Sequence, residues 1–340
     1  MTETETASAE LGEALVRMGL VAPGERPVLT RLAGGVSSDI WRLDRREGPV
    51  CIKRALPQLR VRAPWFAPVE RNAAEVRWMR VAGKIEPDAV PAVIGEDRAA
   101  GLFAMAYLDP KLFPVWKSRL LAGFAEPAVA AAVGERLAHI HAATAGDPAI
   151  AKEFANDHIF YPIRLEPYLV FTADRHPLLA DALRALAAAT AANKRALVHG
   201  DVSPKNILVG PNGPVFVDAE CAWYGDPAFD LAFCLNHMLL KCLARPAIAA
   251  DYLACFDALG ERYLAGVDWE PKRELEQRAA RLLPGLFLGR IDGKSPVEYV
   301  TDESDRERVR EVAAALITRP VARLGEVRDA WATALAEARS

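Results

Sequence analysis

Short β-type runs occupy the first third of this chain, and helical patterns occupy almost all of the rest. A helical stretch at 69–81 interrupts the β-type runs and carries Ala73, Val76 and Met79 on one apolar stripe. Strands that are segregated from helices in this way are typical of an α+β protein. The β-type runs lie at residues 28–32, 40–43, 50–52, 92–95 and 101–106. The helical segments after Asp109 include 128–143, 178–192, 226–243 and 305–317.

One β-type island, residues 196–218, interrupts the helical part with two apolar runs around a polar loop. The chain has 340 residues, and a single hydrophobic core rarely keeps growing beyond about 250–300 residues. We therefore expect two lobes. The first, 1–106, would hold a five-stranded antiparallel sheet and one main helix, preceded by an N-terminal helix. The second, 107–340, would be mainly helical and carry the island.

Composition excludes several classes of function. A net charge of −3 gives no electrostatic reason to expect nucleic acid or an anionic membrane as a partner. Every apolar run is interrupted by charges, Pro or Gly before it could span a bilayer, and the acidic N-terminus is unlike a secretory signal. Five cysteines without a CxxC pair indicate reduced thiols in a cytoplasmic protein. The oligomeric state is not indicated.

The polar loop of the island carries the densest chemical signal. Asp201 is followed five positions later by Asn206, which fits the kinase pattern H-x-D-x-x-x-x-N that begins here at His199. In that pattern the Asp accepts the proton of the substrate hydroxyl and the Asn holds a metal. An ordinary turn would explain the polar residues but not the apolar runs on both sides. His199 is expected to hold the backbone in place rather than take part in chemistry.

A second carboxylate pair follows the island's last apolar run. Asp218 comes directly after 215–217, and Glu220 stands two residues further on. Mg²⁺ binds one or two carboxylates and takes its other ligands from water and substrate phosphates. We therefore predict that Asn206, Asp218 and Glu220 bind Mg²⁺. This order and spacing of two motifs is a much stronger signal than either motif alone.

The expected N-terminal lobe supplies candidates for phosphate binding. Lys53 ends an apolar strand, which is the layout of a kinase phosphate lysine, and Glu75 on the next helix is its favoured partner over Glu70. The loop between the first two strands can bring backbone amides and hydroxyls close to phosphate. Its members are Gly34, Gly35, Val36, Ser37 and Ser38. No GxxxxGK[ST] motif exists, so the chain is not a P-loop enzyme.

The segment after Glu220 argues against a peptide substrate. Only residues 221–224 separate Glu220 from Gly225-Asp226-Pro227. A protein kinase needs a long activation segment at this place to hold a peptide. The sequence therefore predicts that the acceptor is the hydroxyl of a small molecule.

These residues resemble those of a known superfamily. His199-Gly200-Asp201 with Asn206 and Asp218, followed by residues 225–232, resembles the aminoglycoside phosphotransferase and choline kinase superfamily. Within it, residues 53–57, 218–220 and 223–225 are similar to segments of the methylthioribose kinases. The likeness runs in patches from about Leu32 to Tyr299.

The resemblance implies a protein-kinase-like fold with ATP between the lobes and Mg²⁺ as its metal. Met105, Ala106 and Tyr107 would form the hinge strand that meets adenine. Asp230 would brace the catalytic loop, and Lys205 either neutralises phosphate charge or is a solvated loop residue.

The substrate half of the resemblance is weaker than the catalytic half. Methylthioribose kinases lack the loop Asn, and their paired arginines become Gly289-Arg290 here. A sugar-like or polyol metabolite is the favoured acceptor. An aminoglycoside or amino alcohol of the choline type is the alternative, and a non-catalytic nucleotide-binding protein is the third hypothesis. The candidate substrate contacts are Arg290, Asp292, Lys294 and Trp223.

Overall fold

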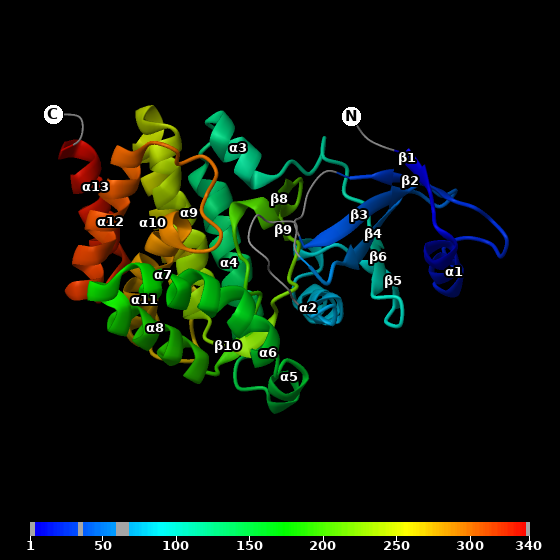
Figure 1. Cartoon of the computed structure of the whole chain (residues 1–340), viewed down its shortest axis with the longest axis horizontal. Coiled ribbons are helices and arrows are strands. Elements are labelled where there is room, and N and C mark those ends of the chain that lie inside the picture. The colour runs from blue at the N-terminus through cyan, green and yellow to red at the C-terminus, as the bar shows by residue number, and fades with distance from the viewer. Residues whose placement is uncertain (1–3, 33–36, 59–67, 338–340) are drawn as a thin grey trace.

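An antiparallel sheet of six strands forms the N-terminal lobe of the computed structural model, which describes residues 4–32, 37–58 and 68–337 (Figure 1). The strands follow the order β1-β2-β3-β4-β6-β5. Their bounds are β1 Thr4–Thr6, β2 Val28–Arg31, β3 Ser38–Leu43, β4 Val50–Ala55, β5 Val93–Asp97 and β6 Leu102–Ala106. Five strands were expected, and the sixth is β1, which pairs with β2 at the sheet edge. A run of Thr-Glu-Thr has no apolar alternation to reveal a strand, and an edge strand needs only main-chain hydrogen bonds.

Helix α2 (Arg71–Ile85) joins this sheet to the second lobe. Its buried residues Val76, Trp78 and Met79 belong to one continuous core with the helices of the second lobe. The helix ends at Ile85, just before Glu86-Pro87, because the residue before a proline disfavours helical backbone. Helix α1 (Ala9–Arg17) packs on the sheet in a separate, smaller core.

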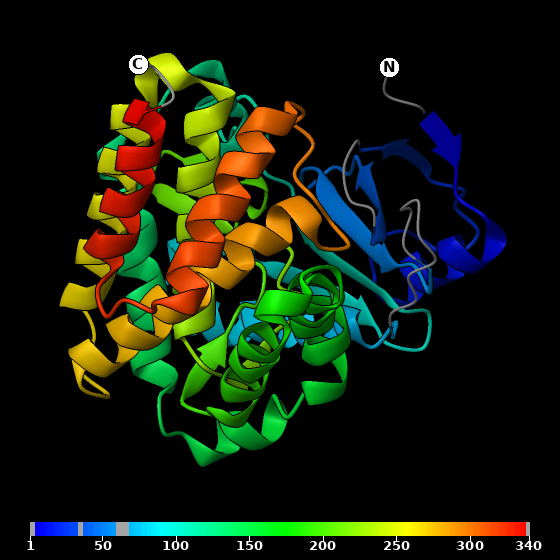
Figure 2. The ribbon, with the colours of Figure 1, turned by 60° about the vertical axis from the view of Figure 1, so that its left-hand side comes forward.

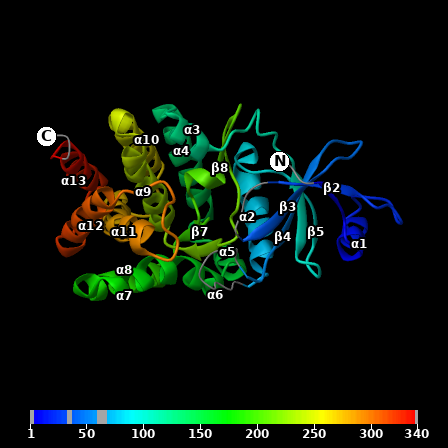
Figure 3. The same cartoon turned by 45° about the horizontal axis from the view of Figure 1, so that its top comes forward.

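The second lobe is mainly helical. Helix α9 lies at its centre, and every residue from Ala228 to Leu243 is buried. Figure 3 shows α12 and α13 at the end of the molecule away from the sheet, and in Figure 2 this end is turned toward the viewer. The helices are α3 Trp116–Ala122, α4 Pro127–Thr144, α5 Pro148–Glu153, α6 Asp157–Phe160, α7 Phe171–Arg175, α8 Ala180–Ala192, α9 Ala228–Ala244, α10 Ala249–Ala265, α11 Lys272–Asp292, α12 Glu303–Thr318 and α13 Leu324–Glu337. Short 3-10 turns lie at η1 Pro87–Ala89, η3 Pro177–Leu179, η4 Pro204–Asn206 and η5 Pro246–Ile248, and η2 (Tyr161–Val170) is a π-helix.

The island forms two small sheets at the face of the second lobe that meets the first. Strand β7 (Ala196–Val198) pairs with β10 (Trp223–Gly225), and β8 (Ile207–Gly210) pairs with β9 (Gly213–Phe216). The catalytic-loop candidates lie between β7 and β8, and Asp218 and Glu220 lie between β9 and β10. The expected two-lobed α+β fold class is confirmed. In the part of the chain that the structure describes, no helix is both long and apolar enough to cross a membrane.

Candidate active site

A cleft of about 460 Å³ opens between the sheet and the second lobe. The predicted hinge residues Met105, Ala106 and Tyr107, at and just beyond the end of β6, line it. On its other sides lie Ser37, Ser38, Lys53, Glu75, Lys205, Asn206 and Asp218, all predicted site residues. The predicted loop residues Gly34, Gly35 and Val36 lie outside the described residues. Most of the predicted nucleotide and metal residues therefore meet in one cleft.

Ser38 stands at the start of β3 with its side chain facing this cleft. The residue is almost fully buried, and its hydroxyl has no hydrogen-bond partner among the described residues. Buried hydroxyls normally have a partner, so an unpaired one in a cleft is a candidate ligand contact.

Lys53 ends an apolar stretch of β4 and lies between two carboxylates. Its amine donates to Glu75 at 2.6 Å and also to Asp218. Burial alone would lower the pKa of Lys53, but the charges of Asp218 and Glu75 outweigh it and raise that pKa above its usual range. Of the two candidate partners in the sequence, Glu75 is the one in contact, because Glu70 precedes the first turn of α2 and is exposed. The lysine is therefore charged and fixed in direction.

Asp218 has an unusual backbone. Its φ is +67°, the only left-handed φ of a non-glycine residue among the described residues, and its N–H donates to Glu75 at 3.1 Å. Burial acts to raise the pKa of Asp218, but Lys53 and Lys205 hold it well below the usual range. Burial raises the pKa of Glu75 to about 7, against the opposing charge of Lys53. A single positive charge, that of Lys53, is thus shared by two buried carboxylates. A further cation beside Asp218 would be stabilised because negative charge is in excess there.

Glu220 is held by a buried arginine that sequence reasoning missed. Arg71, the first residue of α2, donates to Glu220 at 2.9 Å. The same guanidinium donates to the carbonyl oxygens of Ser37, Leu56 and Pro68 at 2.5, 2.6 and 2.9 Å. Arg71 is fully buried, so its ion pair with Glu220 ties the first lobe to the segment that carries Asp218 and Glu220.

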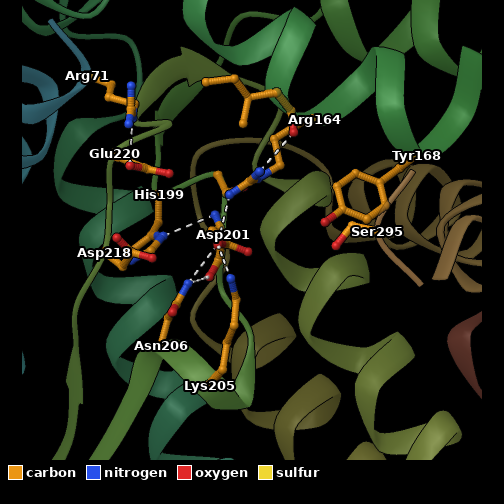
Figure 4. Close-up of polar contacts among 12 residues, drawn as sticks. Arg71, Arg164, Tyr168, His199, Asp201, Lys205, Asn206, Asp218, Glu220 and Ser295 are labelled. Carbon is orange, nitrogen blue, oxygen red and sulfur yellow. Dashed lines mark hydrogen bonds and ion pairs between the residues drawn. The ribbon is translucent and has the colours of Figure 1, made fainter. Parts of the chain in front are cut away.

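The Asp201 carboxylate is almost fully buried and receives three donors (Figure 4). Its Oδ2 contacts Arg164 at 2.8 Å, Lys205 at 3.1 Å and Asn206 at 2.8 Å. None of the described residues donates to the other oxygen, Oδ1. Arg164 comes from the π-helix η2 and also donates to the carbonyl of Gly200 at 2.5 Å. The three contacts fix the carboxylate while leaving one oxygen for a substrate.

Asp230 and His199 support the catalytic loop from behind. Asp230, fully buried near the start of α9, accepts the backbone N–H of His199 at 2.7 Å and of Gly200 at 2.9 Å. His199 Nδ1 accepts the N–H of Asp201 at 3.1 Å, so its Nε2 carries the proton toward the carbonyl of Val217 at 3.2 Å. Burial lowers the pKa of His199, although Asp230 and other carboxylates oppose the shift. A neutral, structural histidine is what this geometry favours.

The described residues offer only a few oxygen ligands for a magnesium ion. Among the described residues, no three His, Cys, Asp or Glu side chains lie close enough to form a metal site. Asn206 and Asp218 line the cleft, and Glu220 follows two residues later. Such a sparse oxygen set fits Mg²⁺, which keeps several waters and shares substrate phosphates. The ionised Asp218 carboxylate supplies the negative charge that the ion requires.

Only one of the four predicted substrate contacts reaches a cavity near Asp201. Arg290 on α11 lines a small cavity together with Lys205. Asp292 is bound instead by Arg310 at 2.9 and 3.0 Å and by His176 at 2.8 Å, and Lys294 by Glu166 at 2.8 Å. Helix α11 ends at Asp292, so Lys294 is no longer four helical positions from Arg290 and does not share its face.

Trp223 is the fourth predicted substrate contact, and the structure places it in the core. It is fully buried in β10, stacks on Phe160 at 4.2 Å between ring centres and donates to Asp157 at 3.2 Å. Its contacts in the structure are packing contacts, and those of Asp292 and Lys294 are ion pairs, so the structure gives no support to the prediction that these three residues contact the substrate.

Gly289 explains why a second arginine does not precede Arg290. A Cβ atom at Gly289 would overlap the carbonyl oxygen of Tyr168, because η2 packs directly on α11 at this point. The hydroxyl of the same tyrosine accepts from Arg290 at 3.0 Å. The close approach of the two helices thus leaves room for the side chain of Arg290 but not for any side chain at position 289.

Comparisons with known proteins point in one direction. The family model described as a phosphotransferase enzyme family matches residues 28–275, more than half of the chain. A methylthioribose kinase of Bacillus cereus is 25% identical over 247 residues, which are 64% of this chain and 62% of that protein. Methylthioribose kinase 1 of Oryza sativa subsp. japonica is 27% identical over 225 residues, 57% of this chain and 51% of that protein. The chain thus spans less than two thirds of the length of these relatives.

Solved structures share the fold. A choline/ethanolamine kinase family protein from Mesorhizobium loti superposes with a TM-score of 0.53 and 17% identity, over 96% of this chain and 99% of that one. A spectinomycin phosphotransferase in complex with ADP and spectinomycin gives a TM-score of 0.50 and 12% identity, over 90% and 93% of the two chains. At these identities the likeness shows the two-lobed fold and not the substrate.

Proposed function

This chain belongs to the phosphotransferase enzyme family, and on that premise we propose that it transfers the terminal phosphoryl group of ATP to a hydroxyl of a small polyol metabolite. One observation carries the proposal. Lys205 and Asn206 both line the large cleft and both contact the Asp201 carboxylate, while Lys205 also lines the small cavity on the other side. A nucleotide in the cleft and an acceptor in the cavity would therefore meet at Asp201.

The chain's own residues supply positioning and charge for this reaction. The acceptor oxygen forms a bond to the γ-phosphorus, and the bond from that phosphorus to the bridging oxygen breaks with its electron pair going to ADP. Asp201 orients the hydroxyl through Oδ1 and takes its proton late, because the transition state is loose. Lys53, aimed by Glu75, and Lys205 neutralise phosphate charge.

Magnesium would be held by Asn206, Asp218 and Glu220. When bound, it would supply positive charge that neutralises the phosphate groups. Glu220 would share or exchange its contact with Arg71 in that state. The adenine would meet Met105, Ala106 and Tyr107 along the apolar part of the cleft.

A small-molecule acceptor is favoured by the path of the chain after Glu220. Strand β10 begins at Trp223 and pairs at once with β7, so the segment turns back into the core. There is no room there for the platform on which a protein kinase holds a peptide. The likeness to methylthioribose kinases supports a polyol as acceptor.

The test is Asp201→Asn. We expect turnover to fall by roughly 10²- to 10⁴-fold, the usual contribution of a general base, because the amide cannot take up the proton. Acceptors for the assay come from a screen of ATP consumption over methylthioribose, other pentoses, polyols, hydroxy acids, amino alcohols and aminoglycosides. Nucleotide affinity, measured by calorimetry, should stay within about threefold because Asp201 does not line the nucleotide cleft. Wild-type turnover in the variant would refute the role of Asp201.

A further inference from the structure

A small cavity lies beside the loop that carries Asp201 and shares Lys205 with the large cleft. Pro204 and Lys205 of the loop form one wall, and its volume is about 20 Å³, enough for roughly one water-sized group. The other walls come from α3, α9, the end of α11 and the segment after it. The residues of these walls are Lys117, His237, Lys241, Arg290, Val297, Glu298 and Tyr299.

Positive charge is in excess around this cavity. Of its four cationic side chains, Lys117 is paired with Glu298, and Lys205 is paired with Asp201. Lys241 and Arg290 have no carboxylate partner among the described residues. Lys241 is 1% exposed, and its amine lies 3.8 Å from the centre of the Tyr299 ring. A buried lysine held only by an aromatic face is unusual, because buried charges are normally paired.

Unpaired polar atoms gather in the same place. His237 Nε2, Arg290 Nε and the hydroxyl of Tyr299 are all buried without a hydrogen-bond partner among the described residues, and all three residues line this cavity. Buried polar atoms in proteins are almost always hydrogen-bonded. Three exceptions around one cavity indicate a ligand that accepts hydrogen bonds.

Electrostatics supports the same conclusion. Burial lowers the pKa of Lys241 to about 7, and Lys117 and Arg290 push it in the same direction while Glu298 opposes them. An anion in the cavity would reverse this shift, because it would stabilise the ammonium form. Burial also holds the pKa of His237 well below its usual range, with Arg290 and Lys241 adding to the effect.

We propose that this cavity binds the anionic group of the acceptor, so that the substrate is a small hydroxy acid rather than a neutral sugar or an amine. The proposal rests on the proposed function and names its substrate class. Lys241 and Arg290 would bind the carboxylate, with Tyr299 and His237 as further polar contacts. Space for about one water-sized group could take one oxygen of a carboxylate but not the several oxygens of a larger phosphate group.

The position of Lys205 sets the length of the substrate. Its amine lies 3.1 Å from the Asp201 carboxylate and its side chain lines the cavity. The hydroxyl that receives the phosphoryl group therefore stands a few bonds from the carboxylate. Cationic acceptors such as aminoglycosides and amino alcohols would be repelled by Lys241 and Arg290.

Matched acceptors test the substrate class. Glycerate and gluconate would be compared with the corresponding polyols, glycerol and glucitol, with ribose 5-phosphate and with ethanolamine, at fixed ATP and Mg²⁺. We expect kcat/KM for at least one hydroxy acid to exceed that of its polyol by about 10- to 150-fold, as for a hydrogen-bonded charge. Equal use of acid and polyol, or preference for ethanolamine or the sugar phosphate, would overturn the inference while leaving the kinase proposal intact. ATP turnover with none of the full acceptor screen would count against the kinase proposal instead.

Lys241→Met separates anion binding from catalysis. Binding of the hydroxy acid alone, measured by calorimetry without nucleotide, should weaken about 10- to 150-fold in this variant and recover partly in Lys241→Arg. At pH 8 the wild type should take up a proton on binding, whereas Lys241→Met should not. The matched control is Lys194→Met, which removes a lysine that also lies on an aromatic ring, 3.9 Å from that of Trp223, but has Asp157 as partner. Unchanged affinity in folded Lys241→Met would mean that the cavity holds only water, and the inference would fall.

Discussion

The cleft that we propose binds the nucleotide and the small cavity that we propose binds the acceptor share Lys205, and they differ in how their charges are satisfied. In the cleft, Lys53 has two carboxylate partners, and beside it Glu220, two residues after Asp218, has Arg71. In the cavity, Lys241 has only the ring of Tyr299. Paired charges hold the geometry of a site before any ligand arrives. Unpaired ones mark the place where the ligand itself must bring the opposite charge.

Breaking a pair on the cleft side should have the largest effect on stability. Arg71→Met leaves Glu220 buried without its countercharge and removes the donor to the Leu56 carbonyl oxygen, while the carbonyls of Ser37 and Pro68 keep backbone donors. We expect the free energy of unfolding, measured by urea denaturation, to fall by roughly 3–5 kcal/mol. The double variant with Glu220→Gln should lose less, because no buried charge remains unpaired. A loss below about 1 kcal/mol in the single variant would show that the pair is not needed.

Removing the unpaired Lys241 from the cavity should stabilise the protein, whereas Arg71→Met should destabilise it. Lys241→Met replaces a buried ammonium with an apolar chain of similar length, and we expect the free energy of unfolding at pH 7 to rise by about 2 kcal/mol. In the wild type the pKa of Lys241 is about 7 when folded and near 10.4 when unfolded. Between these values the unfolded chain holds a proton that the folded one lacks, so stability rises with pH.

Lys241→Met lacks this pH dependence. The difference in free energy of unfolding between the variant and the wild type should therefore be largest at or below pH 7 and shrink toward pH 10. Thermal and urea unfolding across this pH range would measure it. A destabilised Lys241→Met would indicate that Lys241 has a partner after all, and the contrast between the two regions would disappear.

Replacing Ser38 should have the smallest of the three effects, because only one hydrogen bond to the ligand would be lost. Ser38 is an unpaired group in a cleft whose charged groups are otherwise paired. If its hydroxyl binds a phosphate oxygen, Ser38→Ala should weaken ATP by about 1.5 kcal/mol, or roughly tenfold. Stability without nucleotide should not fall, since the hydroxyl has no partner to lose. Calorimetry with ATP and with adenosine separates the cases, because adenosine affinity should not change. Equal weakening of both ligands would place Ser38 against the nucleoside.

Local spacing was sufficient to predict the centre of the site. Asp201 and Asn206 share one loop, and Asp218 and Glu220 follow one short strand, so their distances along the chain fix their distances in space. The main helix and its stripe also led to Glu75 as the partner of Lys53. In the fold, long apolar runs were predicted well, whereas β1 was missed because three polar residues carry no alternation.

Contacts between distant segments could not be predicted in this way. Arg71 reaches Glu220 across 149 positions, and Arg164 reaches Asp201 from a separate helix, η2, whose sequence gives no sign of that contact. Lys241 did leave a signal, a single cation in the apolar segment 231–243 of a central helix, but the sequence does not say what surrounds it. Asp292 and Lys294 were chosen for their nearness to Arg290 along the chain, and the end of α11 separates them.

The contact between Gly289 and the Tyr168 carbonyl has a consequence for redesigning the enzyme. A Gly289→Arg change, which would place a second arginine beside Arg290, would force η2 away from α11. Arg164, which holds Asp201, belongs to that same π-helix. With the roles that we propose for Arg290 and Asp201, acceptor preference and catalysis would be linked through one helix contact, and a change of substrate by laboratory evolution would have to reshape η2 first.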